Sequence, residues 1–337
     1  MAYGSVNADL MTTSDGVSSS GLYGFKNRIL NGQMVIDQRN AGASVTVNSS
    51  TATYPVDRFA GRGVASAGVF TAQQSSTAPS GFNNSVVCTV TTSASPASTD
   101  AYLFRQNIEG FNVADLGWGA SGASTVTLSF WVRSSLTGTF GGAIQNDAFN
   151  RFYPFSYTIS SANTFEYKTI TIAGDTSGTW LKTNGNGMTV SFSLGAGSSR
   201  VNTAGTWTSS ISEGATGQTN LISTNGATFY LTGVQLEKGS TATSFDYRPY
   251  SAELAMCQRY YETGGFVSFT SGGVNGIYQP IQFKVTKRVA AASCTTTNGR
   301  SLTMNIFNDG TGVATGMYQG SNDSGASVST WTVSAEL

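Results

Sequence analysis

The chain has 337 residues, of which only 11% are charged, and its 18 basic residues balance 18 acidic ones. A near-neutral chain without basic runs offers no electrostatic footprint for nucleic acid or anionic lipid, so we expect neither as a partner. The sequence has no histidine, which excludes serine–histidine–aspartate and cysteine–histidine catalysis and metal sites built on imidazole.

The first 26 residues are small and polar and contain few side chains that could form a core. A segment of this kind frays when it is alone. We therefore interpret residues 1–26 as an attachment or oligomerisation segment that packs against another chain. Docking onto its own domain is the alternative. No basic residue precedes Lys26 and no apolar stretch follows, so we expect no secretory signal.

Residues 27–250 contain stretches in which apolar and polar side chains alternate, which predicts strands with one buried and one wetted face. The clearest are 86–91, 124–134, 164–173 and 188–194. Forty glycines and six prolines fit short strands joined by tight turns. The pattern predicts an all-β fold, an antiparallel β-sandwich of the jelly-roll type, with long loops at 45–54, 174–187 and 195–226.

The alternation in 229–236 slips by one residue at Gly233. Phe229 and Leu231 share one face, and Val234 and Leu236 then take it over. A slip at a glycine predicts a β-bulge, because a bulge inserts one residue in a conformation that glycine tolerates.

A short connector helix is predicted over 251–262, with Ser251 as its cap and Leu254, Cys257 and Tyr261 on one stripe. Alternation then resumes at 266–270, 277–286, 302–307, 316–319 and 328–333. Residues 263–337 are therefore predicted to form a small C-terminal β domain.

Other chemistry is sparse. The three cysteines, Cys88, Cys257 and Cys294, are far apart, which favours free thiols over a disulfide framework or a zinc site. The formal G-x-G-x-x-G match at 117–122 precedes a predicted strand instead of a helix, so we expect no nucleotide cofactor. Single, scattered carboxylates argue against a glycosidase, which needs a close pair. No stretch of eighteen apolar residues occurs, so we expect no membrane insertion.

Aromatic residues in loops are the candidates for binding a glycan. They are Trp207, Trp118, Trp180, Phe149 and Tyr153. Trp207 is the best of them, because residues 199–213 offer little to bury it. For each of these residues, a place in the core or at a subunit interface is the alternative.

Asp57 and Arg58 are interpreted as a pair that fixes a corner of the fold through hydrogen bonds. Glu237 and Asp246 flank a turn, where a structural calcium is conceivable. Without a dense cluster of oxygen ligands, however, we expect no metal and no cofactor.

Residues 231–262, LTGVQLEKGSTATSFDYRPYSAELAMCQRYYE, resemble the hinge segment of tailed-bacteriophage virion proteins of the tail-fibre or minor structural type. Two further pieces fit: NRILNGQMVIDQR at 27–39 with YPVDRF at 54–59, and VSAEL at 333–337. The resemblance spans roughly 27–337. Residues of these segments to which we assign a structural role are Asp57, Arg58, Gly233, Glu237, Tyr250, Cys257, Arg259 and Tyr260.

The resemblance implies a jelly roll similar to a carbohydrate-binding module, carried on a virus particle that is assembled in the host cytoplasm. We therefore expect a non-enzymatic tail fibre or similar appendage that attaches the particle to a host surface glycan. The implied partners are two further copies in a homotrimer, other virion proteins through residues 1–26, and a host surface polysaccharide. The alternatives are a purely architectural virion component and a bacterial carbohydrate-binding module or adhesin.

Overall fold

The structure, a computed structural model, describes residues 25–65, 67–270, 279–289, 293–297, 303–308, 314–320 and 325–337. The predicted attachment segment at 1–26 therefore lies almost wholly outside the described residues. Cys88 and Cys257 are buried free thiols.

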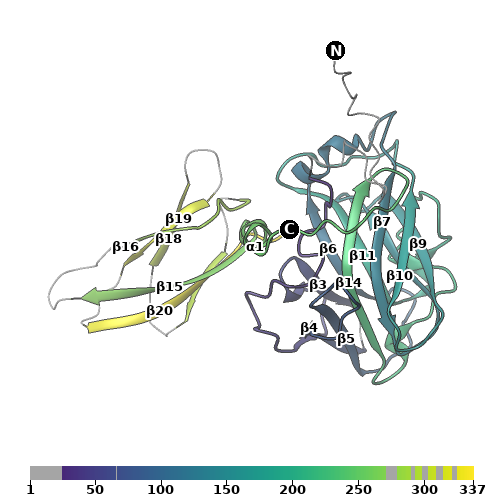
Figure 1. Cartoon of the computed structure of the whole chain (residues 1–337), viewed down its shortest axis with the longest axis horizontal. Helices are drawn as coiled ribbons and strands as arrows, with labels where there is room; N and C mark the ends of the chain where they lie inside the picture. The colour runs from purple at the N-terminus through teal and green to yellow at the C-terminus, as the bar shows by residue number, and fades with distance from the viewer. Residues whose placement is uncertain are drawn as a thin grey trace, which may run out of the picture.

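The main part of the chain is a jelly-roll sandwich of two six-stranded antiparallel sheets (Figure 1). Sheet I contains, in spatial order, β1 (Val45–Val47), β4 (Val69–Ser75), β5 (Ser85–Thr92), β14 (Thr228–Lys238), β7 (Val126–Ser134) and β10 (Glu166–Ile172). Sheet II contains β2 (Thr53–Val56), β3 (Phe59–Val64), β6 (Ala101–Glu109), β11 (Asn186–Ala196), β8 (Gly138–Gln145) and β9 (Phe152–Ile159). The fold class predicted from alternation is confirmed.

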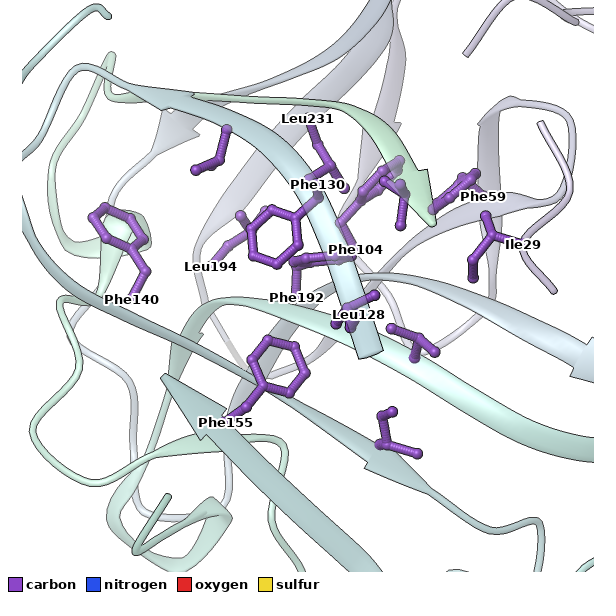
Figure 2. Packing of buried hydrophobic residues seen from close by; sticks show 14 of the residues in the cluster. Ile29, Phe59, Phe104, Leu128, Phe130, Phe140, Phe155, Phe192, Leu194 and Leu231 are labelled. Atoms are coloured by element: carbon purple, nitrogen blue, oxygen red, sulfur yellow. The ribbon is translucent and has the colours of Figure 1, made fainter. Parts of the chain in front are cut away.

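The core lies between the two sheets, where the apolar faces of the predicted strands meet (Figure 2). Phe130 of β7 and Phe192 of β11 belong to opposite sheets, and their rings contact edge to face with centroids 5.0 Å apart. Phe104 and Phe229 are also fully buried. Each large aromatic side chain removes a large apolar area from water, so this layer supplies the main driving force for sandwich formation.

The pairing of β14 with β7 shifts its register between Thr232 and Gln235. The shift falls at Gly233, where the alternation of the sequence slips. Gly233 has a φ of 59°, in the left-handed region that favours glycine. Because of the extra residue, Phe229, Leu231, Val234 and Leu236 are all buried on the core side.

The connector helix α1 (Tyr250–Gln258) is shorter than the predicted 251–262. It ends early because Tyr261 already pairs with Ser334 in the next sheet. The expected cap at Ser251 is also wrong: Pro249 occupies the cap position, and no side chain caps the helix. The helix buries Glu253 and Cys257, one turn apart.

Beyond α1 lie two three-stranded antiparallel sheets, set apart from the sandwich in Figure 1. One contains β15 (Tyr261–Thr270), β20 (Gly325–Ser334) and β17 (Ser293–Thr297). The other contains β16 (Gln279–Gln282), β19 (Ala314–Gly320) and β18 (Thr303–Asn308). Of the long strand predicted at 277–286, residues 277–278 lie outside the described residues, and the described part is extended only over β16. The sequence of β17 shows no alternation from which to predict a strand.

The outer face of sheet II is covered by a long segment of the chain. Residues 198–218 pass over the outer face of sheet II, with η5 (Ser198–Arg200), β12 (Val201–Asn202) and β13 (Gly214–Ala215) among them. Ser212, Glu213 and Ala215 are buried there, and Thr208 forms a bridge with Phe152 of β9. The remaining short elements are η3 (Gly110–Asn112), η4 (Ala114–Leu116) and η6 (Leu221–Ser223). In the part of the chain that the structure describes, every helix is too short or too polar to cross a bilayer.

Candidate functional site: an aromatic groove on sheet I

The tryptophans singled out in the sequence meet one another. Trp118, Trp180 and Trp207 contact edge to face, with ring centroids 4.7 to 5.7 Å apart. Trp118 and Trp180 are only 3% and 7% exposed. Trp207 is half-buried and donates its indole N–H to the carbonyl of Ala173 at 2.8 Å.

The other two candidates lie beside this cluster. Tyr153 is buried against Trp207, with centroids 5.2 Å apart, and Phe149 packs on Phe152. Binding of a glycan by these five residues stays a prediction. Trp118, Trp180 and Tyr153 have almost no ring surface open to solvent, whereas other aromatic residues of the sandwich are exposed.

Such residues line a groove of about 500 Å³ on the outer face of sheet I. Its lining consists of Ser80, Phe82, Ser129, Trp131, Tyr167, Gly233, Ala242, Thr243, Ser244, Phe245 and Tyr247. The volume is in the range of small-ligand sites. We call this site the aromatic groove.

Trp131 and Tyr167 form one part of the groove because of strand register. Phe130 and Val132 point into the core, so Trp131 between them points outward. Tyr167 of β10 lies directly opposite Trp131 of β7 in the pairing of the two strands. The two rings lie 5.4 Å apart, and Tyr167 is 44% exposed. A side-by-side pair of partly exposed rings presents a broad apolar surface at the level of the sheet.

Gly233 lies beside this pair at the bulge. A Cβ atom on Gly233 would lie 2.7 Å from Cζ of Phe82 and 3.0 Å from Cδ1 of Trp131. Glycine is therefore required here for two reasons, its left-handed backbone and the close approach of the two rings. Because position 233 has no side chain, Phe82 and Trp131 can approach each other at the bulge.

The opposite side is a cluster of Phe82, Phe245 and Tyr247, whose ring centroids are 5.0 to 5.6 Å apart. Tyr247 is 54% exposed and donates its hydroxyl to the carbonyl of Gly81 at 2.9 Å. That bond fixes the ring while leaving its face accessible.

Two buried polar residues of β14 hold the segment that carries this cluster. Gln235 accepts a hydrogen bond from the amide N–H of Asp246 at 2.8 Å. Glu237 accepts from the amide and the hydroxyl of Thr243, at 2.9 and 2.6 Å. Glu237 thus acts as an anchor for a loop. Among the described residues, no group of three or more potential metal-binding side chains occurs.

The groove is uncharged: none of its described lining residues is acidic or basic. Its polar side-chain groups are the hydroxyls of Ser80, Ser129, Thr243, Ser244 and the two tyrosines, together with the indole N–H of Trp131. Rings flanked by hydroxyls suit a ligand that has both apolar faces and hydroxyl groups.

The sequence indicated some of the residues that line the aromatic groove. Trp131 falls on the polar side of a strong strand, and Tyr167 falls on the polar side of the predicted strand 164–173. The sequence contains no such indication for Phe82, Phe245 and Tyr247, because they occur in irregular segments whose side-chain direction does not follow from a periodicity.

Five of the residues assigned a structural role, Asp57, Arg58, Cys257, Arg259 and Tyr260, lie where the sandwich meets α1 and the last residues of the chain. Asp57 accepts hydrogen bonds from the amide of Gln38 and from Arg39, both at 3.2 Å. Burial outweighs the attraction of Arg39 and raises the pKa of Asp57 to about 6. Arg58 pairs with Glu336, and its guanidinium lies over the ring of Tyr260 at 3.5 Å.

The same network continues through Glu109. Arg259 pairs with Glu109 at 2.6 Å, and the Tyr260 hydroxyl donates to the same carboxylate at 2.5 Å. Burial raises the pKa of the Tyr260 hydroxyl and of the Cys257 thiol, so both keep their protons at neutral pH. Tyr250 is exposed at the start of α1.

No family model matches the chain, and no curated protein sequence matches it either. Several solved structures do. One is the enzymatically active domain of tailspike protein 4 from bacteriophage CBA120, at 15% identity and a TM-score of 0.31, with 63% of this chain and 21% of that chain covered. Another is a putative sugar binding protein from Bacteroides thetaiotaomicron, at 12% identity and a TM-score of 0.36, with 64% and 100% covered.

A third is the family 11 carbohydrate-binding module of a cellulosomal cellulase from Clostridium thermocellum. Its identity is 10% and its TM-score 0.30, with 60% of this chain and 99% of that chain covered. The chain therefore spans about a fifth of the tailspike chain and nearly the whole of the two sugar-binding chains.

Proposed function

We propose that this protein binds a carbohydrate through the aromatic groove. The observation that supports the proposal most is the in-register pair of Trp131 and Tyr167 on an open sheet face, opposite the ring of Tyr247. The C–H faces of a sugar ring pack on aromatic surface, while its hydroxyls find hydroxyl partners at the edges of the groove.

We propose further that the protein binds without cleaving. Glycoside hydrolysis requires two carboxyl groups on either side of the scissile bond. The described lining of the groove supplies none, and Glu237, which accepts the hydrogen bond of the Thr243 hydroxyl, is a single buried carboxylate outside the lining.

The setting that we propose is the particle of a tailed bacteriophage, where the chain serves as a tail fibre or similar appendage that contacts a host surface polysaccharide. The resemblance of 27–59 and 229–261 to phage virion proteins supports this setting. We propose attachment to other virion proteins through residues 1–26 and assembly as a homotrimer. Several weak grooves on one particle would reach a high avidity through their effective concentration.

A glycan array tests the groove. Trp131→Ala and Tyr167→Ala should each lose at least about tenfold in affinity for the glycan that the unchanged protein selects, because each variant removes stacked apolar area. Phe111→Ala is the matched control, since Phe111 is an exposed aromatic residue on η3, outside the groove. Equal binding by all four proteins would refute the assignment.

A second function is favoured by the same exposed rings, because aromatic residues also anchor interfaces between subunits. In a purely architectural component of the particle, the groove would be covered by a second chain. Trp131→Ala would then lower the oligomeric state measured by light scattering, and no glycan would bind. Imaging of the intact particle with labelled protein would test its place there.

A further inference from the structure

The outer face of sheet I continues beyond the aromatic groove. Arg133 follows Trp131 by two residues on β7, so the two side chains emerge on the same face, about 7 Å apart. Phe165 likewise precedes Tyr167 by two residues. The strand register places Tyr230 of β14 directly opposite Arg133.

These three residues form a second aromatic site adjoining the groove. The guanidinium of Arg133 lies 5.0 Å from the ring centroid of Tyr230 and 5.9 Å from that of Phe165. The two rings are 6.1 Å apart and contact edge to face. All three side chains are half-buried, so part of each faces solvent.

Arg133 lacks the carboxylate partner that several other arginines of the protein have. Arg151 pairs with Asp175 at 2.6 Å, and Arg259 pairs with Glu109 at the same distance. No carboxylate of the described residues lies within 4.0 Å of Arg133, and its side chain is only half-buried. A guanidinium that has no carboxylate partner and adjoins an open groove is available to an anionic group on a ligand.

We propose that the glycan is acidic and that Arg133 binds its anionic group. This inference rests on the proposed function and names the class of saccharide. A neutral sugar ring lies in the aromatic groove, and the next residue along the glycan places a carboxylate or a phosphate on the planar guanidinium, which Tyr230 and Phe165 hold in place. Arginine suits this role because its fork of donors matches both groups.

Continuity with the groove favours an acidic saccharide over an acidic peptide. Trp131 and Arg133 are neighbours on one strand face. Tyr167 of the antiparallel strand β10 lies opposite Trp131, and Phe165, just before β10, lies near Arg133. The strip therefore offers alternating ring surfaces at the spacing of a strand, with its charge at one end. A chain of linked rings with one charged substituent matches that arrangement.

The test uses a panel of bacterial surface polysaccharides, each immobilised as the native form, after reduction of its carboxyl groups, and after removal of its phosphate groups. The unchanged protein should bind an acidic member, and one of the two treatments should weaken that binding about tenfold or more. The treatment that does so identifies the anionic group. This arm needs no variant, so it does not depend on how a variant folds.

Arg133→Gln should weaken binding to the native glycan by the same factor and reduce its dependence on salt concentration. It should bind the treated glycan within about twofold of the unchanged protein, because the charge is then already absent. Lys182→Gln, which removes one positive charge from the exposed 173–185 loop, should bind every form normally.

Three results would overturn the proposal. The first is binding that Trp131→Ala abolishes but that neither treatment nor Arg133→Gln affects; the proposed function would then stand and only the acidic class would fail. The second is equal weakening of Arg133→Gln on native and treated glycans, which would show that the arginine merely packs between the two rings. Absence of binding to any member would overturn both proposals together.

Discussion

A tryptophan is available to a ligand only if its strand position leaves one ring face uncovered. Trp131 meets this condition because its neighbours Phe130 and Val132 occupy the core. Trp118 and Trp180 do not, although their polar, glycine-rich surroundings in the sequence suggested exposure. Each covers the other, with centroids 4.7 Å apart. Local composition therefore predicts exposure poorly when aromatic residues from separate loops converge.

A single residue, Asp57, should make the stability of the folded protein depend on pH. The pKa of Asp57 is about 6 in the folded protein, above its ordinary value, so the folded state holds one proton more than the unfolded chain between about pH 4 and 6. Its contribution to stability is present at the low end of this window and is lost as the pH rises through 6. The slope from this group is at most about 1.4 kcal/mol per pH unit.

Asp57→Asn should remove that slope, since asparagine does not titrate. Urea unfolding followed by tryptophan fluorescence at several pH values from 4 to 7 measures it. Relative to the unchanged protein, the variant should gain stability as the pH rises from 4 to 7, because asparagine avoids the cost of burying a negative charge. An unchanged slope would show that other groups carry the pH dependence.

At the scale of elements, the bulge in β14 affects both the strand pairing of sheet I and the shape of the groove. Gly233→Ala should reduce stability by about 1–2 kcal/mol, because its φ of 59° disfavours a side chain. It should also weaken glycan binding, since the new Cβ would displace Phe82 and Trp131.

Gly117→Ala is the matched control for the bulge. Its φ of 67° imposes a similar backbone cost, but a Cβ there would meet nothing within 4 Å. Thermal melting should therefore be lowered in both variants, whereas glycan affinity should fall only in Gly233→Ala. If both variants bound normally, the bulge would not shape the binding surface.

At the scale of the whole molecule, buried ion pairs join the sandwich to the last residues of the chain. Arg58 and Arg39 both contact Glu336, and Asn107 donates to the carbonyl of Leu337 at 2.8 Å. These contacts span more than 200 positions in the sequence, so they hold the residues that follow β20 against the sandwich.

Arg58→Met should cost about 3–5 kcal/mol of stability, because it removes one partner from a buried pair and leaves Glu336 with less compensation. Chymotrypsin should then release the C-terminal strands more rapidly, which gel electrophoresis and calorimetry would show. Arg62→Met is the control: Arg62 bonds only the carbonyl of Ser50 at an exposed position, so cleavage and melting should stay unchanged. Equal effects of the two variants would contradict the role of the Arg58–Glu336 pair.

The sequence predicted the sandwich because one-sided burial imposes a period of two on each strand, as at 124–134 and 188–194. It did not predict β1, β2, β3, β4, β6, β8 or β9 as individual strands. For some of them the local reason is clear: β3 carries two glycines, β9 has a proline at position 154, and β6 begins with four consecutive buried residues and so shows no alternation there. The helix end was wrong because pairing of Tyr261 with Ser334 overrode the local helical pattern.

By itself, the sequence determined the fold class, the slip at Gly233 and the outward direction of Trp131, since each depends only on neighbours along one strand. The tertiary structure decided which aromatic residues stay exposed, because that depends on packing between segments far apart in the chain. Phe82, Tyr167 and Tyr247 lie in three separate parts of the sequence and line one groove only because strand register and the Gln235 and Glu237 anchors bring them together.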